Sequence, residues 1–169
     1  MRKVAEVILA FLRKIVRPFL RRDDRSPANG LTVDTGLYMG GIGMFISEGK
    51  DVVMTPKGSS MLPFIEGGKD SVVLTAPSRP LEVGDIVLAK VGERYIMHRV
   101  FAVEEDALTL MGDGNIRGTE HCSKGDVIGL VTEIHKAGGR KVVPGKARLW
   151  RWLRPFRRFI LGIYKRVIL

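Results

Sequence analysis

The chain has 169 residues, of which 45% are hydrophobic, and a net charge of +10. This length suits one domain with a substantial hydrophobic core. The single cysteine, Cys122, excludes an intramolecular disulfide and the cysteine-rich ligand sets of structural zinc sites. The three histidines lack the HExxH spacing of zinc peptidases, so we expect no metal and no other cofactor.

The charge divides the chain into three regions. Residues 1–25 carry eight basic and three acidic side chains, and residues 140–169 carry ten basic and no acidic ones. Residues 26–139 carry ten basic against fifteen acidic side chains, and an acidic body argues against a general nucleic-acid-binding fold. We therefore predict a basic N-terminal helix over 1–25, a globular domain over 26–139 and a basic C-terminal segment over 140–169.

The first 22 residues have apolar side chains at helical spacing. Glu6 and the Arg13-Lys14 pair interrupt any run long enough to span a bilayer. The pattern predicts an amphipathic helix that lies on a membrane or on a partner, or else packs on its own domain. Residues 35–47 are uncharged and rich in glycine, and we expect them to form a buried segment.

From Asp51 onward, short apolar runs alternate with turn signals. This pattern predicts a mainly β domain. The expected strands cover residues 52–54, 71–74, 85–89, 95–100, 107–110 and 127–131.

The C-terminal segment combines an aromatic stripe with many basic residues. Pro155 is expected to start or kink the last helix. Aromatic side chains with arginines suit the headgroup region of an anionic membrane, so both basic ends predict peripheral membrane association. The cytoplasmic face of an inner membrane is the favoured location, with a cytoplasmic protein as the alternative. The stripe comprises Trp152, Phe156, Phe159, Ile163 and Val167.

Three separated residues supply the chemical types of a serine-peptidase triad. Ser60 supplies a hydroxyl, His98 an imidazole that can take its proton, and Asp113 a carboxylate that can orient the imidazole. Backbone amides near Gly58 and Ser59 could stabilise an oxyanion.

Five successive boxes resemble those of the signal peptidase superfamily, which also contains LexA-type self-cleaving proteins. The resemblance covers about residues 50–135, and His98 makes it closest to the Ser-His type. It implies a partly barrel-like β fold, metal-free cleavage of peptide bonds, and Ser60, His98 and Asp113 as catalytic residues. The boxes are Gly58 to Pro63, Gly84 to Leu88, His98-Arg99-Val100, Gly112 to Asn115 and Val127-Ile128-Gly129.

The family's second acidic residue has no direct match here, and Glu120 is the candidate to replace it. Met61, Leu62 and Phe64 follow the serine and are candidates for a substrate groove. We expect a serine endopeptidase acting on a leader or membrane-proximal peptide, with a peptide or preprotein as substrate and no specific nucleic acid. The alternatives are a catalytically silent peptide-binding module at the membrane and a LexA-type self-cleaving protein.

Overall fold

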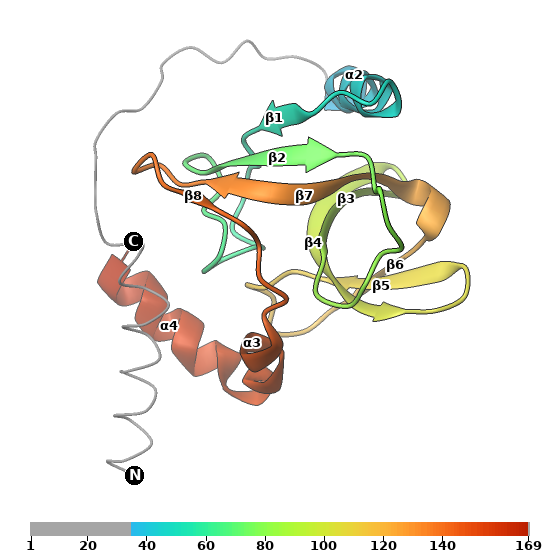
Figure 1. Cartoon of the computed structure of the whole chain (residues 1–169). Coiled ribbons are helices and arrows are strands. Elements are labelled where there is room, and N and C mark those ends of the chain that lie inside the picture. The colour runs from blue at the N-terminus through green and yellow to red at the C-terminus, as the bar shows by residue number, and fades with distance from the viewer. Residues whose placement is uncertain (1–34, 169) are drawn as a thin grey trace.

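The computed structural model describes residues 35–168, and the helix predicted over 1–25 lies outside this range. The described chain is mainly β, as predicted, with an antiparallel sheet curled into a half-barrel and a few helices (Figure 1). Helix α2 (Thr35–Ser47) leads into the sheet, and helices α3 (Arg148–Trp152) and α4 (Arg157–Ile168) follow it. The strands are β1 (Val52–Met54), β2 (Ser71–Thr75), β3 (Ile86–Val91), β4 (Arg94–Val103), β5 (Ala107–Met111), β6 (Glu120–Ser123), β7 (Val127–His135) and β8 (Lys141–Val142).

The strand order is β1-β2-β7-β3-β4-β5-β6, with β8 paired to β7, and every pair is antiparallel. The chain therefore returns from β6 to place β7 between β2 and β3. Figure 1 shows β1, β2 and β7 on one side of the curled sheet and β5 and β6 on the other, joined through β3 and β4.

All six predicted strands are present, and the sequence reading missed β6 and β8. Strand β6 has the sequence Glu-His-Cys-Ser, in which Cys122 is the buried side chain. Strand β8 is two residues long. Neither has the apolar alternation by which strands are recognised from sequence.

The segment predicted to be buried is an α-helix with one buried face. Ile42 and Ile46 are buried in α2, one helical turn apart, whereas Leu37 and Met44 are exposed. The prediction of burial is thus right for one face only, since residues four apart share a helix face.

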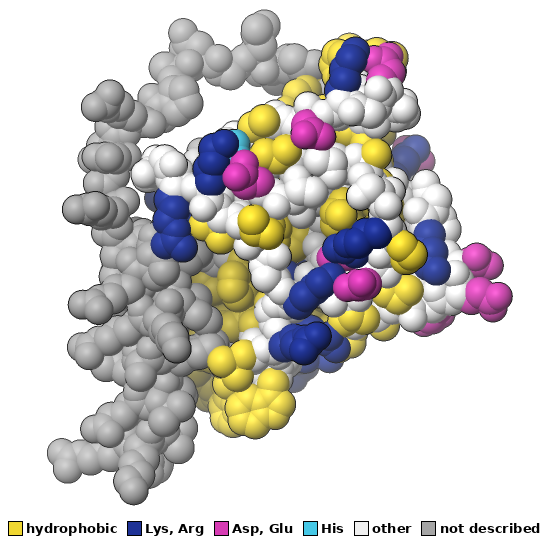
Figure 2. Space-filling model, in the orientation of Figure 1, with side chains coloured by type: hydrophobic (Ala, Val, Ile, Leu, Met, Phe, Trp, Pro, Cys, Tyr) yellow, Lys and Arg dark blue, Asp and Glu magenta, His cyan; other side chains and the backbone are white. Residues whose placement is uncertain are grey.

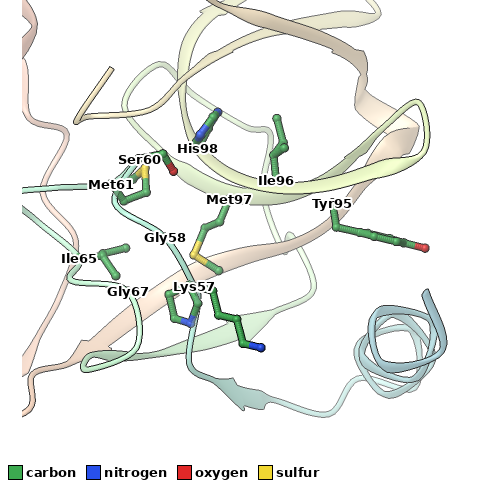
Figure 3. A pocket seen from close by; sticks show the side chains of 11 residues that line it. Lys57, Gly58, Ser60, Met61, Ile65, Gly67, Tyr95, Ile96, Met97 and His98 are labelled. Carbon is green, nitrogen blue, oxygen red and sulfur yellow. The ribbon is translucent and has the colours of Figure 1, made fainter. Parts of the chain in front are cut away.

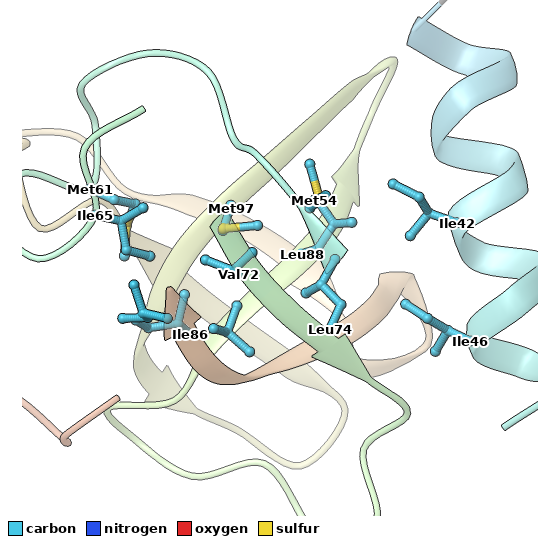
Figure 4. Packing of buried hydrophobic residues seen from close by; sticks show 12 residues of the cluster. Ile42, Ile46, Met54, Met61, Ile65, Val72, Leu74, Ile86, Leu88 and Met97 are labelled. Carbon is cyan, nitrogen blue, oxygen red and sulfur yellow. The ribbon is translucent and has the colours of Figure 1, made fainter. Parts of the chain in front are cut away.

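The main core connects α2, the sheet and the loop after β1 (Figure 4). Ile42 and Ile46 point from α2 toward the sheet residue Leu74. Met61 and Ile65, from the loop between β1 and β2, are buried in the same cluster. The loop that carries Ser60 is therefore fixed by the burial of Met61, the residue directly after the serine, and of Ile65.

The C-terminal segment packs its inner face on this loop. Leu62 is buried against Trp150, Ile160, Leu161 and Tyr164. Pro155 lies in a short 3-10 helix (η3, Arg154–Phe156) directly before α4, which agrees with the predicted helix start. Among the described residues, no helix has the length and apolar character needed to cross a bilayer.

A carboxylate network joins β3 to the C-terminal segment. Asp85 is buried and accepts hydrogen bonds from Arg79, from Lys146 and from the Glu82 amide. Burial acts to raise the pKa of Asp85, but the bonds from Arg79, Lys146 and the Glu82 amide outweigh it and lower the pKa to about 2.

This network predicts an acid-sensitive contribution to stability. The pKa of Asp85 is lower in the folded state than the roughly 3.9 of an unfolded aspartate. Its contribution is therefore complete above about pH 4 and is lost as the pH falls through about 2. We expect the difference in Tm between wild type and Asp85→Asn to narrow by about 3 to 6 °C from pH 5 to pH 2. A constant difference across this range, measured by thermal unfolding, would contradict the assignment.

Candidate active site

Ser60 lies in the loop between β1 and β2, and this loop folds tightly on itself. Gly58 has a φ of 88°, in the region that favours glycine. A Cβ at Gly67 would clash with the Gly58 carbonyl oxygen, so the two ends of the loop are in backbone contact. Ser60 is half-buried, whereas Ser59 is exposed.

The Gly112 to Asn115 turn supports the serine from the other side. The Gly114 amide donates a 2.7 Å hydrogen bond to the Ser60 carbonyl oxygen. A Cβ at Gly112 would lie 2.5 Å from this same oxygen, and one at Gly114 would lie 2.6 Å from the Ser59 oxygen. Gly112 and Gly114 must therefore be glycines, because a side chain at either position would clash with the backbone around Ser60.

His98 is held in strand β4 by a carboxylate. Its side chain is buried, and Nδ1 lies 2.9 Å from Oε2 of Glu120 in β6. A carboxylate accepts hydrogen bonds, so this contact favours the tautomer with the proton on Nδ1. The lone pair of that tautomer is on Nε2, the nitrogen that a general base of this kind uses.

Ser60 and His98 line the same pocket, of about 140 Å³ (Figure 3). Met61, Ile65 and Met97 give it an apolar wall. In Figure 3 the Ser60 hydroxyl and the His98 ring lie at one end of the pocket, and Tyr95 lies toward α2. The pocket therefore places a hydroxyl and an imidazole beside an apolar surface.

Asp113 contacts Arg99 and not His98. Its carboxylate accepts hydrogen bonds from Nε and Nη2 of Arg99, the shortest 2.7 Å long, and both side chains are buried. This corrects the expectation that Asp113 orients the imidazole, because Glu120 is the carboxylate on His98. The physical reason is that His98 and Arg99, as neighbours in a strand, point to opposite faces.

The Arg99–Asp113 pair joins the site to the C-terminal segment. Nη1 of Arg99 also donates to the carbonyl oxygens of Gly84 and Gly145. The Trp150 indole donates to the Asp113 carbonyl oxygen at 3.0 Å. This buried ion pair therefore connects β4 and the turn after β5 to the C-terminal segment, and we assign it a structural role.

The expected groove residues separate into two groups. Met61 lines the pocket beside Ser60. Leu62 is buried in the C-terminal cluster, and Phe64 packs edge-on against Trp150 with its ring centroid 5.7 Å away. The sequence suggested one groove, but Leu62 and Phe64 attach the loop to the C-terminal segment.

The backbone around the serine has amides available for an oxyanion. Within residues 35–168, none of the hydrogen bonds has the amide of Gly58, Ser59 or Ser60 as its donor. Backbone amides of this kind are the usual donors of an oxyanion hole. Gly58 and Ser59 thus remain candidates for that role, together with Ser60 itself.

A half-buried lysine, Lys136, contacts the other end of the loop. Nζ of Lys136 donates to the Phe64 carbonyl oxygen and to the carboxylate of Asp70, both at 2.6 Å. Burial lowers the pKa of Lys136, although Asp70 and Glu66 act in the opposite direction. Sequence reading missed this contact, which ties the loop to the end of β7.

The described part of the chain has no group of three His, Cys, Asp or Glu side chains placed to hold a metal ion. No protein-family model matches the sequence, and no curated protein matches it either.

Proposed function

We propose that the protein is a serine endopeptidase of the signal-peptidase type, with Ser60 as nucleophile, His98 as general base and Glu120 as the residue that orients His98. The observation that carries the proposal is the arrangement of one pocket containing Ser60 and His98 with a carboxylate 2.9 Å from Nδ1 of that histidine. A serine beside a histidine is common in loops. A histidine whose ring is oriented by a partly buried carboxylate is less common, and this arrangement activates a serine hydroxyl.

The reaction follows from these roles. Nε2 of His98 accepts the Ser60 proton as Oγ attacks the scissile carbonyl carbon, and Glu120 stabilises the imidazolium that forms. Amides of the loop bind the oxyanion, and the imidazolium then protonates the leaving amine. Water, deprotonated by His98, hydrolyses the acyl-Ser60 ester and restores the serine.

The pocket favours an apolar side chain next to the scissile bond. A volume of about 140 Å³ lined by Met61, Ile65 and Met97 suits one small or medium apolar side chain. A leader or membrane-proximal peptide of a preprotein supplies such residues in an extended segment, and we propose that class as the substrate.

Cellular protein N-termini test this function directly. We expect a small set of N-termini found in wild-type cells to be lost in a Ser60→Ala strain, because the hydroxyl forms the acyl intermediate. Ser59→Ala is the matched control, since it removes a neighbouring hydroxyl that lies outside the pocket. Quantitative N-terminal proteomics of membrane and soluble fractions measures the effect.

Identical N-termini in wild type and Ser60→Ala, with both proteins folded and equally abundant, would contradict the proposal and favour a silent peptide-binding module. Loss of cleavage within this chain alone would instead indicate the LexA type. Residues flanking the lost N-termini would report the specificity of the pocket.

A further inference from the structure

The outer face of the C-terminal helices exposes large apolar side chains. Trp152 is 72% exposed and Phe159 is 71% exposed. Their inner-face neighbours Trp150 and Ile160 are buried, so α3 and α4 are amphipathic with aromatic residues on the solvent side. We call this surface the aromatic face. It comprises Leu149, Trp152, Phe156, Phe159 and Ile163.

Three exposed arginines, Arg148, Arg154 and Arg158, are interleaved in sequence with the residues of the aromatic face, and Arg151 and Arg157 lie deeper in the same segment. Five arginines lie between residues 148 and 158, and none takes part in an ion pair among residues 35–168. Figure 2 shows hydrophobic and basic side chains adjoining at the end of the molecule where α3 lies in Figure 1. This surface therefore carries uncompensated positive charge beside exposed apolar area.

Two of these arginines line a small pocket with unused donors. The pocket, of about 10 Å³, lies between β4, β5 and the C-terminal helices and is lined by Arg99, Arg151, Arg157 and Asp113. The Nε groups of Arg151 and Arg157 are buried and have no hydrogen-bond partner within residues 35–168. The Asp113 carboxylate is already bonded to Arg99. The space suits one oxygen atom, about the volume of a single water.

Arg157 is a buried cation that forms no ion pair with a carboxylate within residues 35–168. It is 2% exposed, and among the described residues its side chain contacts neutral groups: the Met111 sulfur, the carbonyl oxygens of Asn115 and Trp150, and the Trp150 ring. Burial lowers its pKa, and nearby Arg154 and Arg99 add to this, whereas Asp113 opposes it. An anion that reached this guanidinium from outside the chain would stabilise it.

We propose that the aromatic face and its arginines form a docking surface for anionic membranes, with one phosphate oxygen of a lipid headgroup bound at the Arg151–Arg157 pocket. Exposed Trp and Phe side chains enter the boundary between headgroups and acyl chains, and the surrounding arginines bind lipid phosphates. The inner faces of the same helices pack on Leu62, so membrane docking would hold the Ser60 loop one helix layer, about 10 Å, from the bilayer surface. This proposal stands independently of the peptidase activity.

Lipid fits this surface better than nucleic acid does. Phosphate binding along a nucleic acid needs positive charge without large exposed aliphatic area, whereas Ile163 and Leu149 are about half exposed here. The rest of the described protein also has an acidic excess, which would repel an extended polyanion.

Vesicle co-sedimentation of the full chain tests the proposal. Vesicles of phosphatidylcholine with 30% phosphatidylglycerol are compared with pure phosphatidylcholine vesicles and with a 30-base-pair DNA duplex. We expect binding to the anionic vesicles that exceeds binding to the neutral ones. The double variant Arg154→Gln with Arg158→Gln should weaken binding to the anionic vesicles about 30-fold, since each basic residue near the membrane surface contributes about fivefold to the affinity. Trp152→Ala with Phe159→Ala should weaken it further.

Matched variants distinguish binding through the aromatic face from binding through the net positive charge of the protein. Lys90→Gln with Arg94→Gln removes two exposed charges from the β3–β4 hairpin and should leave binding within about twofold. Arg151→Gln should weaken binding more than Arg148→Gln, because only Arg151 lines the pocket. Equal binding to neutral vesicles, unchanged binding by the α3–α4 variants, or tighter binding to the DNA duplex would each overturn the proposal. Circular dichroism confirms that every variant is folded.

Discussion

Replacement of Glu120 by Gln is expected to lower the rate of peptide cleavage by about 10³- to 10⁴-fold while the protein stays folded. Glutamine keeps the size of the side chain but cannot stabilise the imidazolium, and its amide can present a donor to Nδ1 that selects the wrong tautomer of His98. Purified wild type and variant are compared on a peptide identified from the lost N-termini. Thermal unfolding checks that stability changes little, since Glu120 is partly exposed.

Two further measurements distinguish a Glu120 that orients His98 from a Glu120 that only stabilises the fold. Glu120→Asp keeps the carboxylate, so it should recover a large part of the lost rate. The pH dependence of kcat/KM should change in Glu120→Gln, since the general base loses its charged partner. If Glu120→Gln cleaves at the wild-type rate, or if its loss of rate follows a loss of folded protein, Glu120 does not orient His98.

Replacement of Asp113 by Ala is expected to reduce the free energy of unfolding by about 3 to 5 kcal/mol. The change leaves the Arg99 guanidinium buried without its charge partner, whereas in the wild type the two side chains make three hydrogen bonds. Denaturant unfolding measures the loss. The matched control is Glu48→Ala, which breaks an exposed ion pair with Lys50 and should cost less than about 1 kcal/mol.

The double variant Arg99→Met with Asp113→Leu tests the cause. Removing both charges together should recover part of the stability lost in Asp113→Ala, because no buried charge remains unpaired. An Asp113→Ala variant as stable as wild type would contradict the structural role of the pair. A variant of full stability that had lost all activity would return Asp113 to the catalytic role expected from the sequence.

The register of the sheet explains why Glu120, the second acidic candidate, contacts His98 and Asp113 does not. His98 and Val100 are two positions apart in β4 and therefore lie on the same face of the sheet. Val100 lies opposite Leu110 in β5, and Leu110 lies opposite Glu120 in β6. Opposed residues of neighbouring strands share a face, so this register places Glu120 on the face of His98. Strand β6 has no apolar pattern to reveal it, and without that strand the register could not be constructed.

The same argument places Asp113 on the other face. Arg99 lies opposite Met111, and Asp113 follows Met111 by two residues beyond the end of β5. The apolar runs were enough to predict six strands and a mainly β fold, since side-chain alternation marks strands locally. Which carboxylate contacts His98 depends on strand pairings between residues at least ten positions apart, and local sequence patterns do not determine these pairings.

The C-terminal helices illustrate the same difference between pattern and packing. The aromatic stripe was recognised from its helical spacing, and in the structure its described members are exposed. The residues that bury the inner face, such as Trp150 and Ile160, lie between them, and their partner Leu62 comes from the serine loop. Periodicity identified the aromatic stripe alone, and the tertiary contacts show that a different apolar face, with Trp150 and Ile160, meets the domain.

The most direct measurement is cleavage of a proteome-derived peptide library by the purified full chain in detergent micelles, read by mass spectrometry. Wild type and Ser59→Ala should generate the same small set of new peptide ends with an apolar residue next to the cleaved bond. Ser60→Ala and His98→Ala should generate none of them. If Ser60→Ala cleaved the same bonds at the wild-type rate, or if the wild type cleaved none, the assignment of Ser60, His98 and Glu120 as a peptidase active site would be wrong.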